Sequence, residues 1–259
     1  MAVFTFASAS GSPGVTTTVL ALAFAWPRPV VVVEADPIAG SPILAGYFQG
    51  LAEPAGGMVD LMVAQRQDQL VDRLASVLMP IPDTSVRVLP GVQTRAQVSG
   101  LAGIWAPLLQ VLRGVQETGT DVLVDAGRFP ATGPFTPLVL GADVLLLVTG
   151  SNVPGTATAR ALLIELTEQR PAGIGLLVVG PERPYSAGEV AGVLGLPAIG
   201  HLAWDPRAAA VYSQGERPTR KTERSAFQRS VRATGEAIRD FADTARHPHP
   251  HALSIGGLS

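Results

Sequence analysis

Apolar and polar positions alternate along the chain with two different spacings. Short runs rich in valine, leucine and isoleucine are followed by longer segments in which apolar residues recur with helical spacing. This alternation is typical of a mostly parallel sheet covered by helices on both faces, so it predicts a doubly wound α/β fold in three layers. The predicted strands are residues 3–7, 30–34, 86–89, 121–125, 144–149, 174–179 and 198–201. The predicted helices are residues 16–25, 58–63, 67–79, 105–118, 156–170, 187–194, 207–214 and 225–245.

The connections between these elements are short and marked by glycine or proline. Because neither a linker nor an internal repeat interrupts the pattern, residues 1–245 are predicted to form one domain. Residues 246–259 are rich in proline, histidine and glycine and are predicted to be a disordered tail. His247, His249 and His251 alternate with prolines and offer metal ligands, but a loose tail is the favoured interpretation.

Composition narrows the class of protein. Hydrophobic residues make up 47% of the 259 residues, charged residues 15%, and the net charge is −2, which favours a compact globular protein over a nucleic-acid-coating one. The chain has no cysteine, which excludes disulfides, thiolate nucleophiles and zinc–thiolate sites and fits a cytoplasmic protein. No apolar run is long enough for a membrane span, although attachment to the inner face of the membrane stays open.

The stretch "SASGSPGVTTT", residues 8–18, lies between a predicted strand and a predicted helix, as a phosphate-binding loop does. Gly14 takes the last glycine position of such a loop and Thr16 the hydroxyl position that holds magnesium. Val15 stands where the lysine belongs, and Pro13 removes one backbone donor. The loop therefore keeps its turn and its hydroxyl but has lost its positive charge. Lys221 is the only lysine of the chain, so no lysine nearby in the sequence replaces it.

Two further predicted strands end in acidic residues. The run "VVVVEAD" ends in Glu34 and Asp36, and "DVLVDAG" places Asp125 at the end of its strand. Ligands of doubly wound sheets bind beyond the carboxyl ends of the strands, so these three acids and Thr16 are expected to converge on one place. Such an oxygen-rich arrangement suits a hard cation.

The loop and the acids together resemble the ParA/MinD group of deviant-Walker ATPases. The loop of that group reads Lys-Gly-Gly-Val-Gly-Lys-Thr-Thr, and its second strand ends in an Asp-x-Asp-Pro segment. In this alignment Ser10 takes the place of the signature lysine, and Val15 that of the catalytic lysine. The nucleotide-binding residues that the resemblance implies are Gly11, Ser12, Gly14, Val15, Thr16 and Thr17.

The acids also have counterparts in this group. Asp36 falls on the switch aspartate that orients the attacking water, which makes it the one catalytic candidate, and Glu34 replaces the first aspartate of that segment. Asp125 falls on the Walker B aspartate. The resemblance implies a magnesium site at Thr16, Asp36 and Asp125, and ATP or ADP as a ligand whose binding is weak or lost.

The resemblance extends to about residue 218 and implies a P-loop NTPase-like fold. "LGADVLLLVTGSNVPGTATARALLIEL" is similar to the strand, loop and helix after Walker B, and "VLGLPAIGHLAWDPRAAAVYSQGERP" to the C-terminal stretch. Gly180 stands where many members have an adenine-contacting asparagine. "GGMVDLM" followed by "VRVLPG" is most similar to the MinD-like branch that contains the TadZ and CpaE pilus-localisation proteins.

The missing lysines argue against ATP hydrolysis. A charge-assisted hydrogen bond is worth about 1.5–3 kcal/mol, so losing the loop lysine is expected to weaken nucleotide binding roughly ten- to a hundredfold. The nearest arginine by sequence to Asp125 is Arg128, whose competing interpretation is a solvated loop residue. For Asp36 and Asp125, inherited architecture without present use competes about evenly with weak binding of a magnesium nucleotide.

Near the C-terminus, residues 225–245 form an amphipathic pattern in which Phe227, Val231, Ile238 and Phe241 share one helical face. A helix that packs on the domain is favoured over a membrane-surface or partner helix, because acidic residues offset the arginines and the apolar face lacks tryptophan.

Three functions are consistent with these observations. The first is a pseudo-ATPase that positions a pilus or secretion system, a division site or a chromosome through protein partners. The second is a weak magnesium-dependent ATPase that dimerises on ATP. The third, DNA partitioning, is the weakest because the net charge is near neutral and the arginines are taken to be scattered. Since Ser10 cannot reach a partner's nucleotide as the signature lysine does, any homodimer is expected to form without nucleotide.

Overall fold

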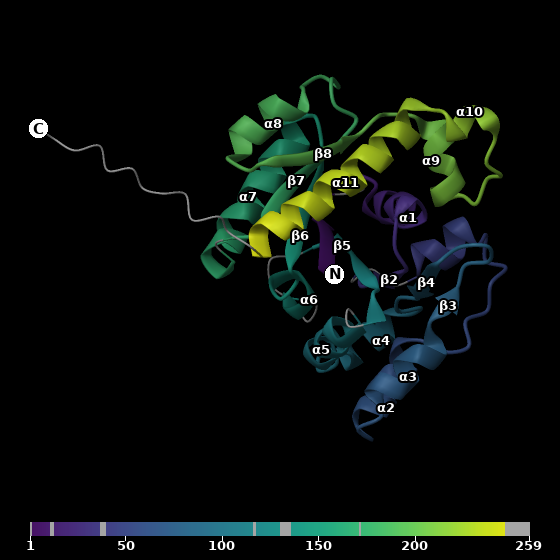
Figure 1. Cartoon of the computed structure of the whole chain (residues 1–259). Helices are drawn as coiled ribbons and strands as arrows, with labels where there is room; N and C mark the ends of the chain where they lie inside the picture. Colours follow the sequence, from purple (N-terminus) through teal and green to yellow (C-terminus); the bar gives the residue numbers. More distant parts are fainter. Residues whose placement is uncertain are drawn as a thin grey trace, which may run out of the picture.

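The computed structural model describes residues 2–10, 13–36, 40–115, 118–129, 136–170 and 172–246. Eight strands form one sheet in the order β3-β4-β2-β5-β1-β6-β7-β8, and β3 alone is antiparallel to its neighbour. The strands are β1 (Val3–Ser8), β2 (Val30–Glu34), β3 (Met79–Pro80), β4 (Val86–Leu89), β5 (Asp121–Arg128), β6 (Val144–Gly150), β7 (Ile174–Val179) and β8 (Ala198–Leu202). The predicted doubly wound α/β class is confirmed (Figure 1).

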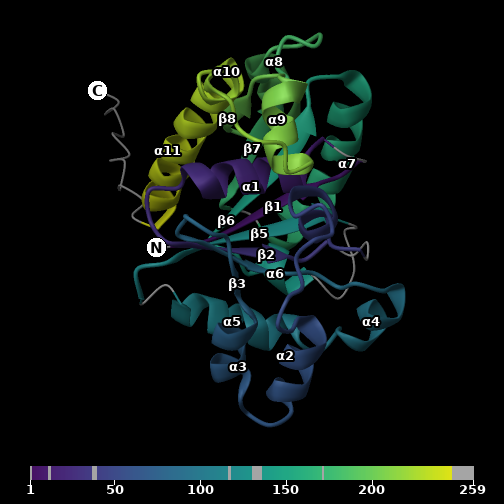
Figure 2. The ribbon, with the colours of Figure 1, turned by 90° about the vertical axis from the view of Figure 1, so that its right-hand side faces the viewer.

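Helices connect the strands and cover both faces of the sheet (Figure 2). They are α1 (Val15–Ala25), α2 (Met58–Gln65), α3 (Leu70–Val77), α4 (Arg95–Gly100), α5 (Trp105–Val115), α6 (Thr136–Leu140), α7 (Val153–Gln169), α8 (Ala187–Leu194), α9 (Pro206–Ser213), α10 (Arg220–Glu223) and α11 (Ala226–Arg246). A short π-helical turn, η1 (Ile43–Tyr47), follows β2. Within the described residues, no helix combines the length and apolarity needed to cross a bilayer.

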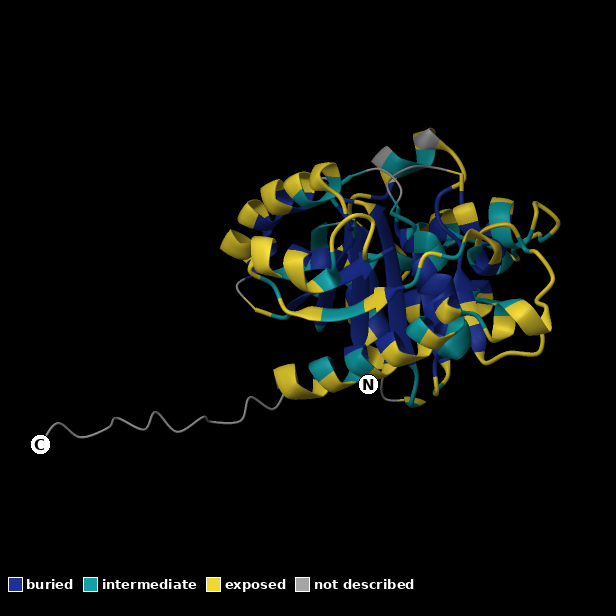
Figure 3. Cartoon of the chain, turned by 90° about the horizontal axis from the view of Figure 1, so that it is seen from above, coloured by how far each residue is buried: buried dark blue, intermediate teal, exposed yellow. Residues whose placement is uncertain are grey.

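The strands are continuous apolar runs because both of their faces are buried. In β1, Phe4 and Phe6 point into the core beneath α1 and α11, while Val3 and Ala7 point to the opposite face. Figure 3 shows the consequence: the central strands are buried, and exposed residues gather on the outer sides of the helices. The edge strands β3 and β8 also carry exposed residues.

Helix α11 closes the face that α1 also covers. Phe227, Val231 and Ile238 are at most 3% exposed, and the helix packs on β8 and α1. Its apolar face is therefore covered by the domain, as the sequence favours. The apolar residues of α11 that could have bound a membrane surface are packed into the core instead.

The boundaries of several elements differ from the predicted ones for identifiable reasons. The helix predicted over residues 67–79 ends at Val77, because Met79 belongs to β3 and pairs with Val88 of β4. The sequence analysis missed α4, α6, α10 and η1, which are each too short to show a helical period. The tail was predicted to begin at residue 246, but Arg246 is the last residue of α11. The rest of the predicted tail, with His247, His249 and His251, lies outside the described residues, and the single domain over residues 1–245 stays a prediction.

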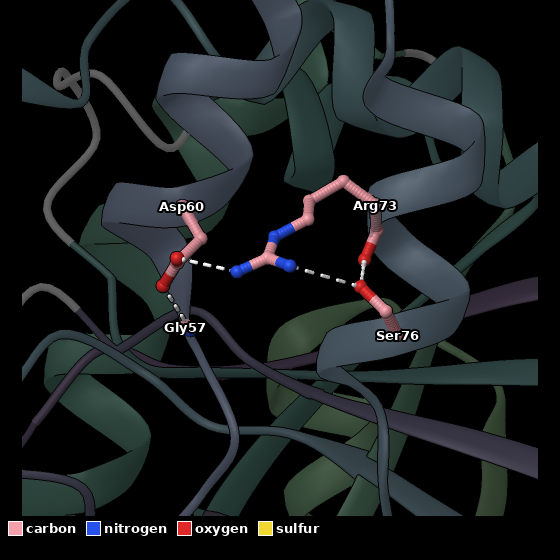
Figure 4. A network of polar contacts seen from close by, with 4 residues as sticks. All are labelled: Gly57, Asp60, Arg73 and Ser76. Carbon is pink, nitrogen blue, oxygen red and sulfur yellow. Dashed lines mark hydrogen bonds and ion pairs between the residues drawn. The ribbon is translucent and has the colours of Figure 1, made fainter.

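Helices α2 and α3 are joined by a polar contact at the surface (Figure 4). Asp60 accepts a hydrogen bond from the Gly57 amide at 2.9 Å and one from Arg73 at 2.7 Å. Both charged side chains are 39% exposed, so this ion pair contributes little to stability.

Buried Asp121 links the start of β5 to the residue before β1 and to the segment that follows α1. Its carboxylate accepts hydrogen bonds from the Ala2 amide at 2.9 Å and from Trp26 Nε1 at 2.8 Å, and it pairs with Arg28 at 3.0 Å. This carboxylate is therefore structural, and it lies at the end of β5 opposite to Asp125.

Arg170 plays a similar structural part after α7. Its buried guanidinium donates to the carbonyl oxygens of Leu140 at 2.8 Å, Ala142 at 2.6 Å and Asp143 at 3.0 Å. These carbonyls follow α6 and lead into β6, so one side chain supplies the donors that the end of α6 lacks.

Candidate functional site

The loop after β1 ends in a left-handed turn at Gly14, where φ is +87°. Helix α1 begins directly afterwards at Val15, and the Thr18 amide bonds the Gly14 carbonyl at 2.8 Å. The Val15 side chain is 5% exposed and belongs to the core cluster of β1 and α1. At the position that the resemblance assigns to a lysine, the chain therefore has a packing residue. Gly11 and Ser12 lie outside the described residues.

Beyond the carboxyl ends of β1, β2 and β5, the predicted polar residues do come together. Thr16 begins the exposed side of α1 and lies close enough to Asp125 to lower the pKa of that carboxyl by hydrogen bonding. Asp36 follows β2 and lies against Gly127, whose φ of +54° and missing Cβ leave room for the carboxylate. The sequence prediction that Thr16, Asp36 and Asp125 converge is borne out by this geometry. Thr17 lies beside Thr16 in the first turn.

Glu34 also reaches this place, but its oxygens are already engaged. It is 1% exposed and accepts hydrogen bonds from the Ser41 hydroxyl, from the Ile43 amide at 2.8 Å and from the Gly91 amide at 3.0 Å. Its carboxylate thus fastens the start of η1 and the loop after β4, and the part of Glu34 in a hard-cation arrangement stays a prediction. The hydrogen bonds partly offset the burial that raises the pKa of Glu34.

The electrostatic state of Asp125 follows from its surroundings. The pKa of Asp125 is raised to about 7, mainly by burial, and repulsion by Glu34 and Asp36 acts in the same direction. The Thr16 hydroxyl and the Gly127 amide, 2.9 Å from Oδ1, oppose this rise. Within the described residues no cationic group contributes, and Oδ2 has no hydrogen-bond partner. Burial is therefore the main reason why this carboxyl is hard to ionise.

These residues fit a magnesium nucleotide poorly. A hydroxyl and two carboxylates are oxygen donors of the kind that Mg²⁺ prefers. Three such oxygens would leave the other positions around the ion to phosphate oxygens or water. Triphosphate binding also needs positive charge, and Val15 supplies none.

A cavity of about 910 Å³ opens beside the loop. Ser10 and Pro13 line it on one side, and the loops after β6 and β7 line it on the other. Buried Ser151 joins these two loops, because its hydroxyl donates to the Gly180 carbonyl at 2.5 Å and accepts from the Arg183 amide at 3.1 Å. The cavity wall is therefore held in place by hydrogen bonds.

The sequence analysis missed two residues of this cavity. The Arg183 guanidinium lies over the Trp204 ring, 4.9 Å from its centre, and both side chains line the cavity. A Cβ at Gly180 would come within 3.4 Å of both side chains, which explains why no larger residue stands there. Arg128, the arginine that the sequence suggested, is exposed at the end of β5 and does not line the cavity. Only the folded chain brings Arg183 near the loop.

Replacing Gly127 with alanine is expected to lower the free energy of unfolding by about 2–3 kcal/mol, because its Cβ would overlap the Asp36 carboxylate at a positive φ. Urea unfolding measures the change. In the control, Gly188→Ala, the new Cβ on α8 has no neighbour within 4 Å, so we expect no loss there. Equal stability of the two variants would contradict the close packing of Asp36 on Gly127.

The sheet order, the loop and the strand-end acids define a P-loop NTPase-like α/β protein. No protein-family model and no curated protein matches the sequence. Solved structures match almost the whole chain. The septum site-determining protein MinD of Pyrococcus horikoshii OT3, complexed with Mg-ADP, is 17% identical with a TM-score of 0.73, covering 94% of this chain and 98% of that one.

Two further structures point to the same fold. A ParA-family ATPase of Chlorobium tepidum TLS is 18% identical with a TM-score of 0.68, over 95% of this chain and 98% of that one. MinD from the MinC:MinD cell division complex of Aquifex aeolicus is 17% identical with a TM-score of 0.72, over 93% and 96%. The chain has the MinD/ParA fold.

Proposed function

We propose that this protein is a MinD/ParA-like pseudo-ATPase that acts as a spatial-positioning scaffold through protein contacts. The observation that carries the proposal is Val15, which is buried in the core where the resemblance expects the catalytic lysine. Hydrolysis develops negative charge on the γ-phosphate, and enzymes of this type stabilise it with cations. Here three carboxyl groups, those of Glu34, Asp36 and Asp125, lie beside the loop in place of a cation.

The proposed context is a pilus or secretion system, a division site or a chromosome. MinD of Aquifex aeolicus forms a complex with MinC, and the Chlorobium tepidum protein is a ParA-family ATPase, which supports work through protein partners. We place the protein in the cytoplasm or at the inner face of the membrane. Its homodimer is proposed to form without nucleotide, which sedimentation velocity of the nucleotide-free protein tests.

Calorimetric titration with ATP and Mg²⁺ tests the loss of nucleotide function. We expect the wild type to show no binding at micromolar concentrations and no phosphate release. Val15→Lys restores the missing charge and is expected to tighten binding by roughly ten- to a hundredfold. Binding that only Val15→Lys gains would mean that the rest of the nucleotide site is still present.

Because Val15 packs in the core, a matched control is needed. Val15→Met has a similar length without charge, so it separates the effect of the ammonium group from that of disturbed packing. Circular dichroism checks that both variants fold. Micromolar binding together with steady ATP turnover by the wild type would overturn the proposal.

A weak magnesium-dependent ATPase is the second candidate, and one observation favours it. Thr16, Asp36 and Asp125 still lie together, as a residual magnesium site requires. If that function is retained, Asp36→Asn abolishes the turnover of the wild type in the same assay. DNA partitioning predicts instead a salt-dependent mobility shift of nonspecific DNA.

A further inference from the structure

Basic residues gather in one short segment of the chain. Residues 216–232 carry six basic side chains and two acidic ones, whereas the whole chain has a net charge of −2. All six are exposed, and none forms an ion pair within the described residues. We call them the basic rim: Arg217, Arg220, Lys221, Arg224, Arg229 and Arg232. The expectation that the arginines are scattered is therefore wrong for this segment.

The basic rim stands on α10 and on its flanks, beside α9 and the beginning of α11 (Figures 1 and 2). A groove of about 940 Å³ opens at this place. Arg217, Arg224 and Arg232 line its edge, and Leu51, which is 83% exposed, lies at another part of the edge. A concave surface of this volume has the size of a ligand or side-chain pocket.

Aromatic side chains form the floor of the groove. The Tyr47 ring centre lies 5.4 Å from that of Phe24 and 5.0 Å from that of Phe48, and the Phe24 centre lies 5.6 Å from that of Tyr212. These rings come from α1, the turn after β2 and α9, so they meet only in the folded chain. An aromatic floor with arginines at the edge has the composition of an energetically strong protein interface.

The two walls of the groove are fixed to each other. Gln49 Nε2 donates to the Gln214 carbonyl at 2.9 Å, and the Tyr212 hydroxyl donates to Gln228 at 2.9 Å. At Gly215, where φ is +64°, a Cβ would overlap the Tyr47 carbonyl, so the backbones of the two walls are in contact. The groove is thus preformed, which lowers the entropic cost of binding.

We infer that this groove binds an acidic peptide segment of a partner protein, with one large aromatic or aliphatic side chain seated on the aromatic floor. Carboxylates of the segment pair with the basic rim, since guanidinium groups bind carboxylates with two parallel hydrogen bonds. This inference specifies the class of partner that the proposed scaffold binds. Its meaning in the cell rests on the proposed scaffold function.

The geometry favours a peptide over other anionic partners. Duplex DNA and an anionic bilayer present broad phosphate surfaces, which would contact the basic rim and leave the recessed aromatic floor unfilled. Glu216 and Glu223 also line the groove and would repel a uniformly charged surface. A peptide with spaced carboxylates and one apolar anchor avoids both problems.

Fluorescence anisotropy tests the inference with a labelled peptide of alternating Asp and Ser around a central Trp. We expect micromolar binding that weakens at least about tenfold when the central Trp is replaced by Ala in the peptide. The protein variant Arg224→Glu/Arg232→Glu is expected to weaken binding at least about tenfold as well. The control Arg66→Glu/Arg160→Glu makes the same change of net charge at two exposed positions, one directly after α2 and one on α7, and should bind as the wild type does.

Three results would overturn the inference. One is equal binding by the wild type and the Arg224→Glu/Arg232→Glu variant, with folding of both confirmed by circular dichroism. Another is equal binding of the Trp and Ala peptides, which would leave only a charge effect. The third is tighter binding of duplex DNA, or of phosphatidylserine vesicles, that the same variant abolishes. Peptide binding and ATP binding are measured separately, so failure of this inference is distinguishable from failure of the proposed pseudo-ATPase.

Discussion

Replacing Asp125 with asparagine is expected to stabilise the protein at about pH 8, by up to about 4 kcal/mol. In the folded protein the pKa of Asp125 is raised to about 7, mainly by burial, from an ordinary value of 3.8. Between these values the unfolded chain releases the proton while the folded chain keeps it, so stability falls as pH rises through this window. Asparagine cannot ionise, and it keeps a carbonyl oxygen for the Gly127 amide.

Urea unfolding from about pH 5 to about pH 8 measures this effect, and the gain of Asp125→Asn is expected to grow with pH. Glu34, whose pKa is also raised by burial, is present in both proteins, and Asp125→Asn additionally removes the repulsion between the two carboxyls. Asp240→Asn changes an exposed carboxylate on α11 and serves as the control without such a gain. A gain that does not change with pH would mean that Asp125 ionises normally in the fold.

Replacing Arg170 with alanine is expected to lower the free energy of unfolding by about 3–5 kcal/mol. The variant leaves the carbonyl oxygens of Leu140, Ala142 and Asp143 without their donor, and it opens a void beside α6. Burial already lowers the pKa of Arg170, so the charge itself is costly and the hydrogen bonds are what it provides. Chemical denaturation at neutral pH measures the loss.

Arg160→Ala is the matched control, since Arg160 is exposed on the same helix and should change stability by less than about 0.5 kcal/mol. Arg170→Lys separates charge from geometry. A lysine keeps the charge but cannot spread its donors over three carbonyls, so we expect an intermediate loss. If the alanine variant is as stable as the control, α6 has another source of donors.

The fold was predictable because most of its strands are continuous apolar runs in the sequence. The runs at 30–34, 86–89 and 174–179 coincide with β2, β4 and β7. The convergence of Asp36 and Asp125 was predictable for the same reason, since the carboxyl ends of parallel strands meet at one edge of a sheet. Boundaries failed where tertiary pairing decides them, as at Met79, which leaves the helical pattern to pair with Val88.

The parts that sequence reasoning missed depend on contacts between distant segments. Nothing local to Glu34 indicates that Ser41, Ile43 and Gly91 will occupy its oxygens, because Gly91 is far away in the sequence. The pairing of Arg183 with Trp204 depends equally on the loops that β7 and β8 bring together. The basic rim, in contrast, is a local excess of basic residues that is visible in the sequence of residues 216–232.

The Glu34 hydrogen bonds have a consequence for control of the proposed scaffold. Through Ser41 and Ile43 this carboxylate fastens the turn that carries Tyr47, and Tyr47 belongs to the floor of the groove. These hydrogen bonds hold Ser41 and Ile43 through the protein's own atoms. If the groove serves the proposed scaffold, its floor keeps its shape in this way, and we expect its occupancy to follow the concentrations of the protein and of its partner.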